Sequence, residues 1–117
     1  MEILIHGNGV TVTETLHTAI QTKIGRVEQY APRALRARVR LRRISARPSP
    51  RQYLVRVLFE IPGNDLSAEQ SGPDFISALD LVAETIERRL RRRKTKVLAR
   101  RQRRAIRETI ASQQPVT

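Results

Sequence analysis

The sequence predicts an α+β domain in which two helices pack on one face of a four-stranded sheet. Apolar and polar residues alternate over residues 35–44 and 51–61, which is typical of half-buried strands. Apolar residues recur every three to four positions over residues 14–30 and from residue 75 onwards, which is typical of amphipathic helices. The chain has 117 residues, of which 39% are hydrophobic, so it has the size of one domain and enough apolar residues for a core.

The first two predicted elements are a short strand and a helix. Residues 2–6 are rich in β-branched residues and precede the turn sequence Gly7-Asn8-Gly9, which predicts a strand. A helix is predicted over residues 14–30, because Thr13 can cap its first turn and Pro32 disfavours helical geometry just before it. The apolar stripe of this helix consists of Leu16, Ile20, Ile24 and Val27.

Three strands that form an antiparallel meander are predicted next, at residues 35–44, 51–61 and 65–71. The first of them has an apolar face of Leu35, Ala37, Val39 and Leu41 and a polar face of Arg36, Arg38, Arg40 and Arg42. A strand before the first helix and a strand after it are parallel if they are neighbours. Because each strand has one apolar face, we expect the helices to cover that side and to leave the arginines on an open face with Arg56.

The second helix begins after Asp74, which is a good N-cap, and its apolar stripe extends to Leu90. We predict a domain over residues 1–96. Residues 97–117 form an arginine-rich C-terminal extension, expected to be a frayed helix or disordered, with the last six residues disordered.

Charge is distributed in blocks, within a formal net charge of +12. Residues 33–56 hold nine arginines and no acid, residues 57–87 hold seven acids and no base, and residues 88–117 hold twelve bases and one acid. Arginine outnumbers lysine by 20 to 3, and guanidinium groups match phosphate oxygens with two hydrogen bonds. These blocks favour a nucleic acid as the partner over an anionic membrane or an acidic protein. With two Tyr, two Phe and no Trp, binding is expected through phosphates rather than through base stacking.

The sequence lacks the patterns of catalysis and of metal binding. It has no cysteine, and its two histidines, His6 and His17, have no matching cluster of ligands. It also lacks the glycine-rich phosphate loops and the serine motif of hydrolases. We therefore expect no enzymatic activity, cofactor, metal or small-molecule substrate. Without a membrane-length apolar stretch or a signal peptide, the protein is expected to be cytoplasmic, with no membrane partner.

Three segments together resemble one known family. They are G-x-x-V-x-V-T-E-x-L over residues 7–16, P-G followed by L-x-A-E within residues 62–69, and D-F-I-S-A-L-D followed by I-E-R-x-L-R-R-x-K within residues 74–94. The chain is similar here to the ribosome hibernation-promoting factors, also known as ribosome-associated inhibitor A or sigma-54 modulation proteins. The resemblance covers residues 1–96 and matches the short form of the family, whose fold has the predicted β-α-β-β-β-α order. Arg89 departs from the pattern, because the family usually has Gln there, and residues 97–117 have no counterpart in typical short members.

The resemblance implies a translation inhibitor that binds ribosomal RNA of the small subunit, in the channel of messenger and transfer RNA, and acts in stress. It also implies that Lys23 and the basic end of the second helix face that RNA. Including the arginines of the open face, the candidate RNA-binding residues are Lys23, Arg36, Arg38, Arg40, Arg42, Arg88, Arg89, Arg91, Arg92, Arg93, Lys94 and Lys96. The alternative is a basic protein that binds DNA or modulates transcription with its second helix. The free protein is expected to be monomeric.

Overall fold

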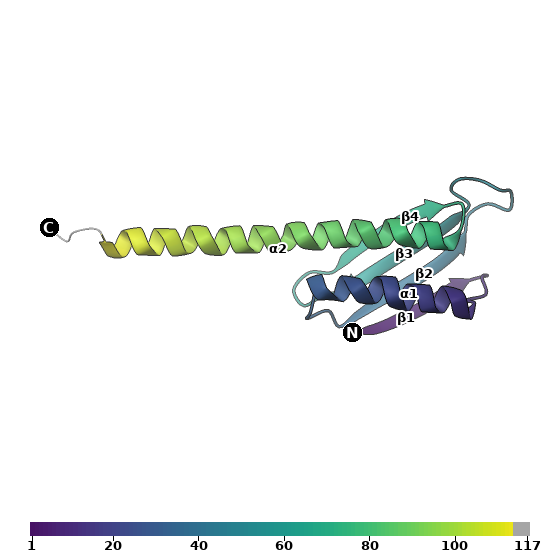
Figure 1. The fold of residues 1–117 in the computed structure, drawn as a ribbon, viewed down its shortest axis with the longest axis horizontal. Helices are drawn as coiled ribbons and strands as arrows, with labels where there is room; N and C mark the ends of the chain where they lie inside the picture. Colours follow the sequence, from purple (N-terminus) through teal and green to yellow (C-terminus); the bar gives the residue numbers. More distant parts are fainter. Residues whose placement is uncertain (114–117) are drawn as a thin grey trace.

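The structure of the protein is a computed structural model that describes residues 1–113, without the side chains of residues 94–98 and 107–113. Its elements are β1 (Glu2–Asn8), α1 (Glu14–Val27), the 3-10 helix η1 (Glu28–Tyr30), β2 (Arg36–Arg43), β3 (Tyr53–Glu60), β4 (Leu66–Gly72) and α2 (Phe75–Gln113). The strands form one sheet in the order β1-β2-β3-β4, in which β1 is parallel to β2 and the other pairs are antiparallel. Both helices lie on one face of this sheet (Figure 1), so the predicted α+β fold is confirmed.

The first helix begins and ends close to the predicted positions. The hydroxyl oxygen of Thr13 accepts a hydrogen bond from the backbone N of Leu16 at 3.2 Å, which is the expected N-cap. The predicted helix over residues 14–30 is in fact an α-helix to Val27 and one 3-10 turn. Tightening into a 3-10 turn is common at the C-terminal end of a helix. The stripe of Leu16, Ile20, Ile24 and Val27 is buried.

The second helix starts at its predicted cap and extends far beyond the sheet (Figure 1). The Asp74 carboxylate accepts hydrogen bonds from the backbone N of Ser77 at 2.7 Å and from its hydroxyl at 3.1 Å. The helix is continuous from Phe75 to Gln113, in a molecule 76 Å long. The backbone helix therefore shows no break at residue 96, where the sequence analysis placed the boundary between the domain and the extension. That boundary stays a prediction. Of the six terminal residues predicted to be disordered, Ser112 and Gln113 belong to α2 instead, and residues 114–117 lie outside the described part.

The core lies between the sheet and the two helices. In β2, buried Ala37, Val39 and Leu41 alternate with arginines, as the sequence pattern predicted. Leu35 is a correction, because its side chain is 61% exposed rather than inward. Leu35 lies one residue before β2, where its backbone N still pairs with Glu60 O but the helices no longer cover the side chain.

Among the described residues, neither helix combines the length and the apolar character that a membrane-spanning helix needs.

Candidate nucleic-acid interface

The face of the sheet opposite the helices carries the predicted row of arginines. Arg38, Arg40 and Arg42 are exposed on β2 and Arg36 is half-buried, while the residues between them are buried in the core. The register extends this row across the sheet, because residues paired on neighbouring strands share a face. The open face consists of four rows: Glu2, Arg36 and Glu60; Leu4, Arg38, Leu58 and Ser67; His6, Arg40, Arg56 and Glu69; and Asn8, Arg42, Leu54 and Ser71.

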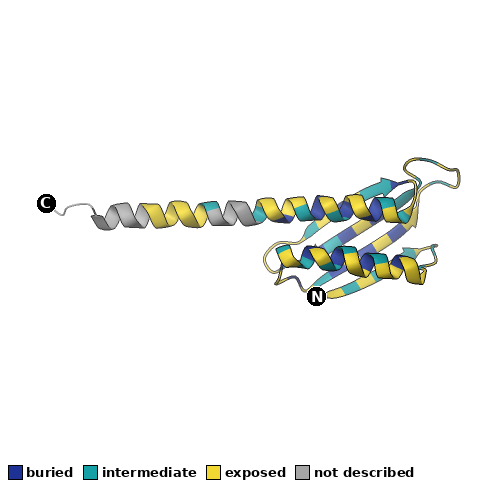
Figure 2. Cartoon of the chain, in the orientation of Figure 1, coloured by how far each residue is buried: buried dark blue, intermediate teal, exposed yellow. Residues whose placement is uncertain are grey.

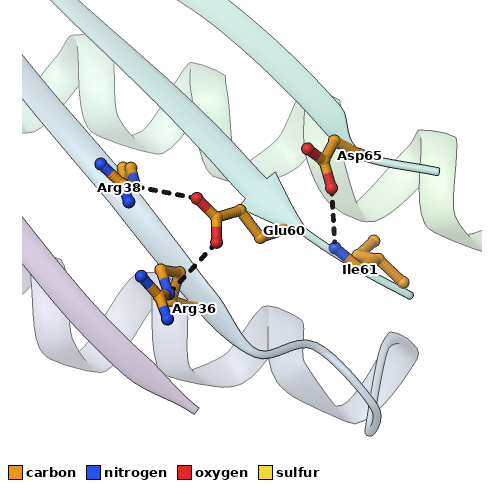
Figure 3. A network of polar contacts seen from close by, with 5 residues as sticks. All are labelled: Arg36, Arg38, Glu60, Ile61 and Asp65. Carbon is orange, nitrogen blue, oxygen red and sulfur yellow. Dashed lines mark hydrogen bonds and ion pairs between the residues drawn. The ribbon is translucent and has the colours of Figure 1, made fainter. Parts of the chain in front are cut away.

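One end of the open face is neutralised by Glu60. Figure 3 shows the Glu60 carboxylate between two guanidinium groups: Arg38 Nε donates a hydrogen bond to Oε1 at 2.8 Å, and Arg36 Nε lies 3.1 Å from Oε2. The contact of Arg36 is an ion pair without the alignment of a hydrogen bond, and its Nε is otherwise buried without a partner. Beside it, Asp65 accepts a hydrogen bond from Ile61 N and closes the turn between β3 and β4. Sequence reasoning missed Glu60, although its parity with Arg56 on the same strand placed both on the open face.

The other end of the open face keeps its positive charge. Arg40 on β2 and Arg56 on β3 are directly opposite partners, and Arg42 lies two residues further along β2. A shallow hollow of about 620 Å³ lies here, bordered by these arginines and by His6 and Asn8 of β1. Glu69 of β4 is the strand partner of Arg56. Within the described part of the chain, none of the three arginines takes part in a side-chain hydrogen bond or an ion pair.

Several candidate residues on the helical side are held by contacts within the protein. Lys23 of α1 forms a close ion pair with Asp80 of α2, which ties the two helices together. Arg89 Nη1 donates to Ser67 O at 2.6 Å, and Arg93 Nη1 donates to Asn64 O at 3.0 Å. These three residues therefore fix α2 against α1 and against β4 with its preceding turn.

Arg91 lies against Tyr30 of η1. Its Nη2 donates to the Tyr30 hydroxyl at 2.8 Å, its guanidinium carbon is 4.9 Å from the centre of the ring, and the Glu87 carboxylate is 2.9 Å away. The hydrogen bond with Tyr30, followed by the charges of Tyr30 and Glu87, raises the pKa of Arg91 above its ordinary value. The guanidinium stays charged, but it is already engaged by Tyr30 and Glu87.

Arg88 and Arg92, on the part of α2 that packs on the sheet, are available to bind a partner. Both are exposed, and within the described part of the chain neither makes a side-chain hydrogen bond or an ion pair. They lie four residues apart and therefore on one side of the helix. The side chains of Lys94 and Lys96, also predicted to bind RNA, lie outside the described residues.

The arrangement defines a small α+β domain with two basic surfaces, one on the open face of the sheet and one along α2. A family model described as "Sigma 54 modulation protein / S30EA ribosomal protein" matches residues 3–98 of the chain. The chain belongs to this family, as the motifs within residues 7–16 and 74–94 predicted.

Two curated relatives have the same name. The ribosome hibernation promotion factor of Deinococcus radiodurans is 32% identical over 98 residues, which are 84% of this chain and 51% of that protein. The protein of the same name from Staphylococcus aureus is 29% identical over 96 residues, 80% of this chain and 48% of that protein. The chain thus spans about half the length of these relatives.

Two solved structures share the fold. One is a ribosomal subunit interface protein from Coxiella burnetii, with a TM-score of 0.72 at 20% identity, covering 81% of this chain and 99% of that one. The other is the N-terminal domain of Protein Y from Thermus thermophilus, with a TM-score of 0.66 at 21% identity, covering 79% and 98%. At these identities the likeness concerns the fold alone.

Proposed function

We propose that this chain is a ribosome-associated hibernation factor that binds ribosomal RNA of the small subunit, in the channel used by messenger and transfer RNA. The observation that carries the proposal is the family match over residues 3–98 together with the shared name of the curated relatives. Such a factor needs no catalytic group, because a folded domain that occupies the channel excludes messenger and transfer RNA by its volume.

The charges of the described residues support RNA as the partner. Arg88 and Arg92 on α2, and Arg40 and Arg42 on the sheet, are exposed guanidinium groups without a partner in the described chain. Such groups bind phosphate oxygens with charge-assisted hydrogen bonds, and binding releases the counterions of the RNA. Lys23, Arg36, Arg38, Arg89, Arg91 and Arg93 contribute charge to the same surfaces while they hold the fold together.

Sedimentation with purified small ribosomal subunits tests the proposal. The protein should move with the subunits at low salt and be released as the salt concentration rises. In the variant R88Q/R92Q the slope of log K against log salt should become less steep by roughly 1.5, at ~0.7–0.9 per lost phosphate contact. The matched control is R33Q/R47Q, which removes the same charge from two exposed loop arginines and should leave the slope nearly unchanged. A wild-type protein that stays at the top of the gradient at low salt would contradict the proposal.

A second candidate is a DNA-binding or transcription-modulating protein, which is favoured by the exposed basic residues Arg100–Arg104 on the projecting part of α2. A basic helix of this kind could lie in a DNA groove. Sedimentation of a cell extract that has been cleared of DNA by nuclease separates the two functions. A ribosome-bound protein still sediments with small subunits, whereas a DNA-bound protein does not.

A further inference from the structure

We propose that the open face of the sheet holds a second phosphate-binding site, formed by Arg40, Arg42 and Arg56, for the backbone of an RNA strand. The site lies on the side of the sheet opposite α1 and α2, so it is separate from the basic surface of α2 (Figure 1). RNA as the source of the phosphate rests on the proposed function, whereas the affinity for phosphate rests on the face itself.

The fold places a like-charge pair on the open face without an ion pair to either member within the described residues. Arg40 and Arg56 are directly opposite partners on neighbouring strands, where like charges repel. Arg42 adds a third guanidinium two residues along the same strand, which is about 6.5–7 Å away. A phosphate seated between Arg40 and Arg56 would replace this repulsion by charge-assisted hydrogen bonds from both sides.

The other end of the same face differs in its charge balance. There, Arg36 and Arg38 are also neighbours on β2, but both are paired with the Glu60 carboxylate (Figure 3). Glu2 lies in the same row and adds a second negative charge. At the end formed by Arg40 and Arg56, the one acid in the row is Glu69 on the edge strand β4, and it forms no ion pair within the described residues. A phosphate is therefore attracted to one end of the face and competes with Glu60 at the other.

The hollow at the charged end has the size and lining of a ligand site. Its volume of about 620 Å³ lies within the ~300–1,000 Å³ of ligand sites. Leu4 and Leu54 contribute apolar surface, while His6 and Asn8 contribute polar groups. Arg38 adds a fourth guanidinium to the lining, and Glu69 adds one carboxylate. This combination fits one nucleotide unit, with the phosphate on the guanidinium groups and the sugar and base over the leucines. The described residues that line the hollow include no Phe, Tyr or Trp ring, so binding should come mainly from the phosphate contacts and little from base stacking.

Two phosphate sites on opposite sides of one domain would let the protein bind two RNA segments at once. Binding at the second site would then be intramolecular, which raises the overall affinity without any further contact.

The test measures binding of a labelled, unstructured RNA of twelve nucleotides to the full chain and to two variants with equal charge. R40Q/R56Q should weaken binding at least tenfold and make the salt slope less steep by roughly 0.7, the value for the one phosphate of a single strand that the pair holds. R33Q/R47Q removes the same charge from two exposed loop arginines that do not line the hollow, and it should weaken binding less than threefold. Equal losses in the two variants would mean that net charge alone acts, and they would overturn the proposal.

Two further measurements complete the test. Thermal unfolding should show that R40Q/R56Q is at least as stable as the wild type, because the substitution removes a repulsive pair. ATP serves as a free-nucleotide competitor. If ATP displaces the RNA when both are present at equal concentration, the hollow is a nucleotide site, and the assignment to an RNA backbone would be overturned. This assay contains no ribosome, so a failure of the proposed function would appear in the sedimentation experiment and not here.

Discussion

The first half of α2, which packs on the sheet, and the second half, which projects beyond it, are stabilised in different ways. In the first half, one side of the helix is buried against the sheet and α1, through residues that include Leu79, Val82, Ile86 and Leu90. In the second half, every residue from Arg100 to Ile106 is exposed (Figure 2). Arg100 also faces like charges three and four residues further on, at Arg103 and Arg104, which costs ~0.2–0.5 kcal/mol per pair. Burial therefore holds the first half in place, whereas residues 100–106 of the second half are exposed and depend on local helix propensity.

The largest difference between the halves should appear on truncation of one isoleucine in each. Ile86→Ala removes a fully buried side chain and should lower the free energy of unfolding by about 2–5 kcal/mol. Ile106→Ala, at a residue 58% exposed, should change it by less than about 0.5 kcal/mol. Denaturant unfolding of both variants measures the contrast. Similar losses would show that the second half is also packed.

Truncation of the chain after Lys96 separates stability from affinity. The melting temperature should stay nearly the same, because residues 100–106 of the removed segment are exposed. The affinity for small subunits should fall about tenfold, equivalent to ~1.4 kcal/mol, with a shallower salt dependence, because five arginines are lost. Unchanged affinity at low salt would assign the whole binding function to residues 1–96.

Loss of the N-cap of α2 should have the smallest effect. Asp74→Ala removes the acceptor for Ser77 N and should reduce stability by ~1 kcal/mol. Asp74→Asn is the matched control, because an amide oxygen still caps the helix and only the charge is lost. Both are measured by thermal unfolding. An equal loss in the two variants would mean that the charge of Asp74 near the helix N-terminus, and not its hydrogen bond, stabilises α2.

Local patterns in the sequence were sufficient to predict the fold and the row of arginines. The alternation around Val39 fixes which residues of β2 face the helices, because a shift of one residue would bury the arginines. Long-range contacts were not predictable in this way. Such contacts depend on how far each helix is rotated and displaced over the sheet, and the periodicity of apolar residues in the sequence does not specify these two quantities. Examples are the pairs Lys23–Asp80, Arg91–Tyr30 and Arg89–Ser67. As a result, the sequence indicated where positive charge lies but not which charges are already engaged.

The hydrogen bond from Arg89 to Ser67 has a consequence for self-association. Ser67 belongs to β4, an edge strand of the sheet, and edge strands present backbone groups that a strand of another molecule can pair with. The guanidinium group of Arg89 places a charged donor on this strand, and Arg93 does the same at the turn before it. A second copy would have to displace or desolvate these charges in order to extend the sheet. We therefore expect Arg89 to protect the β4 edge against aggregation by strand addition.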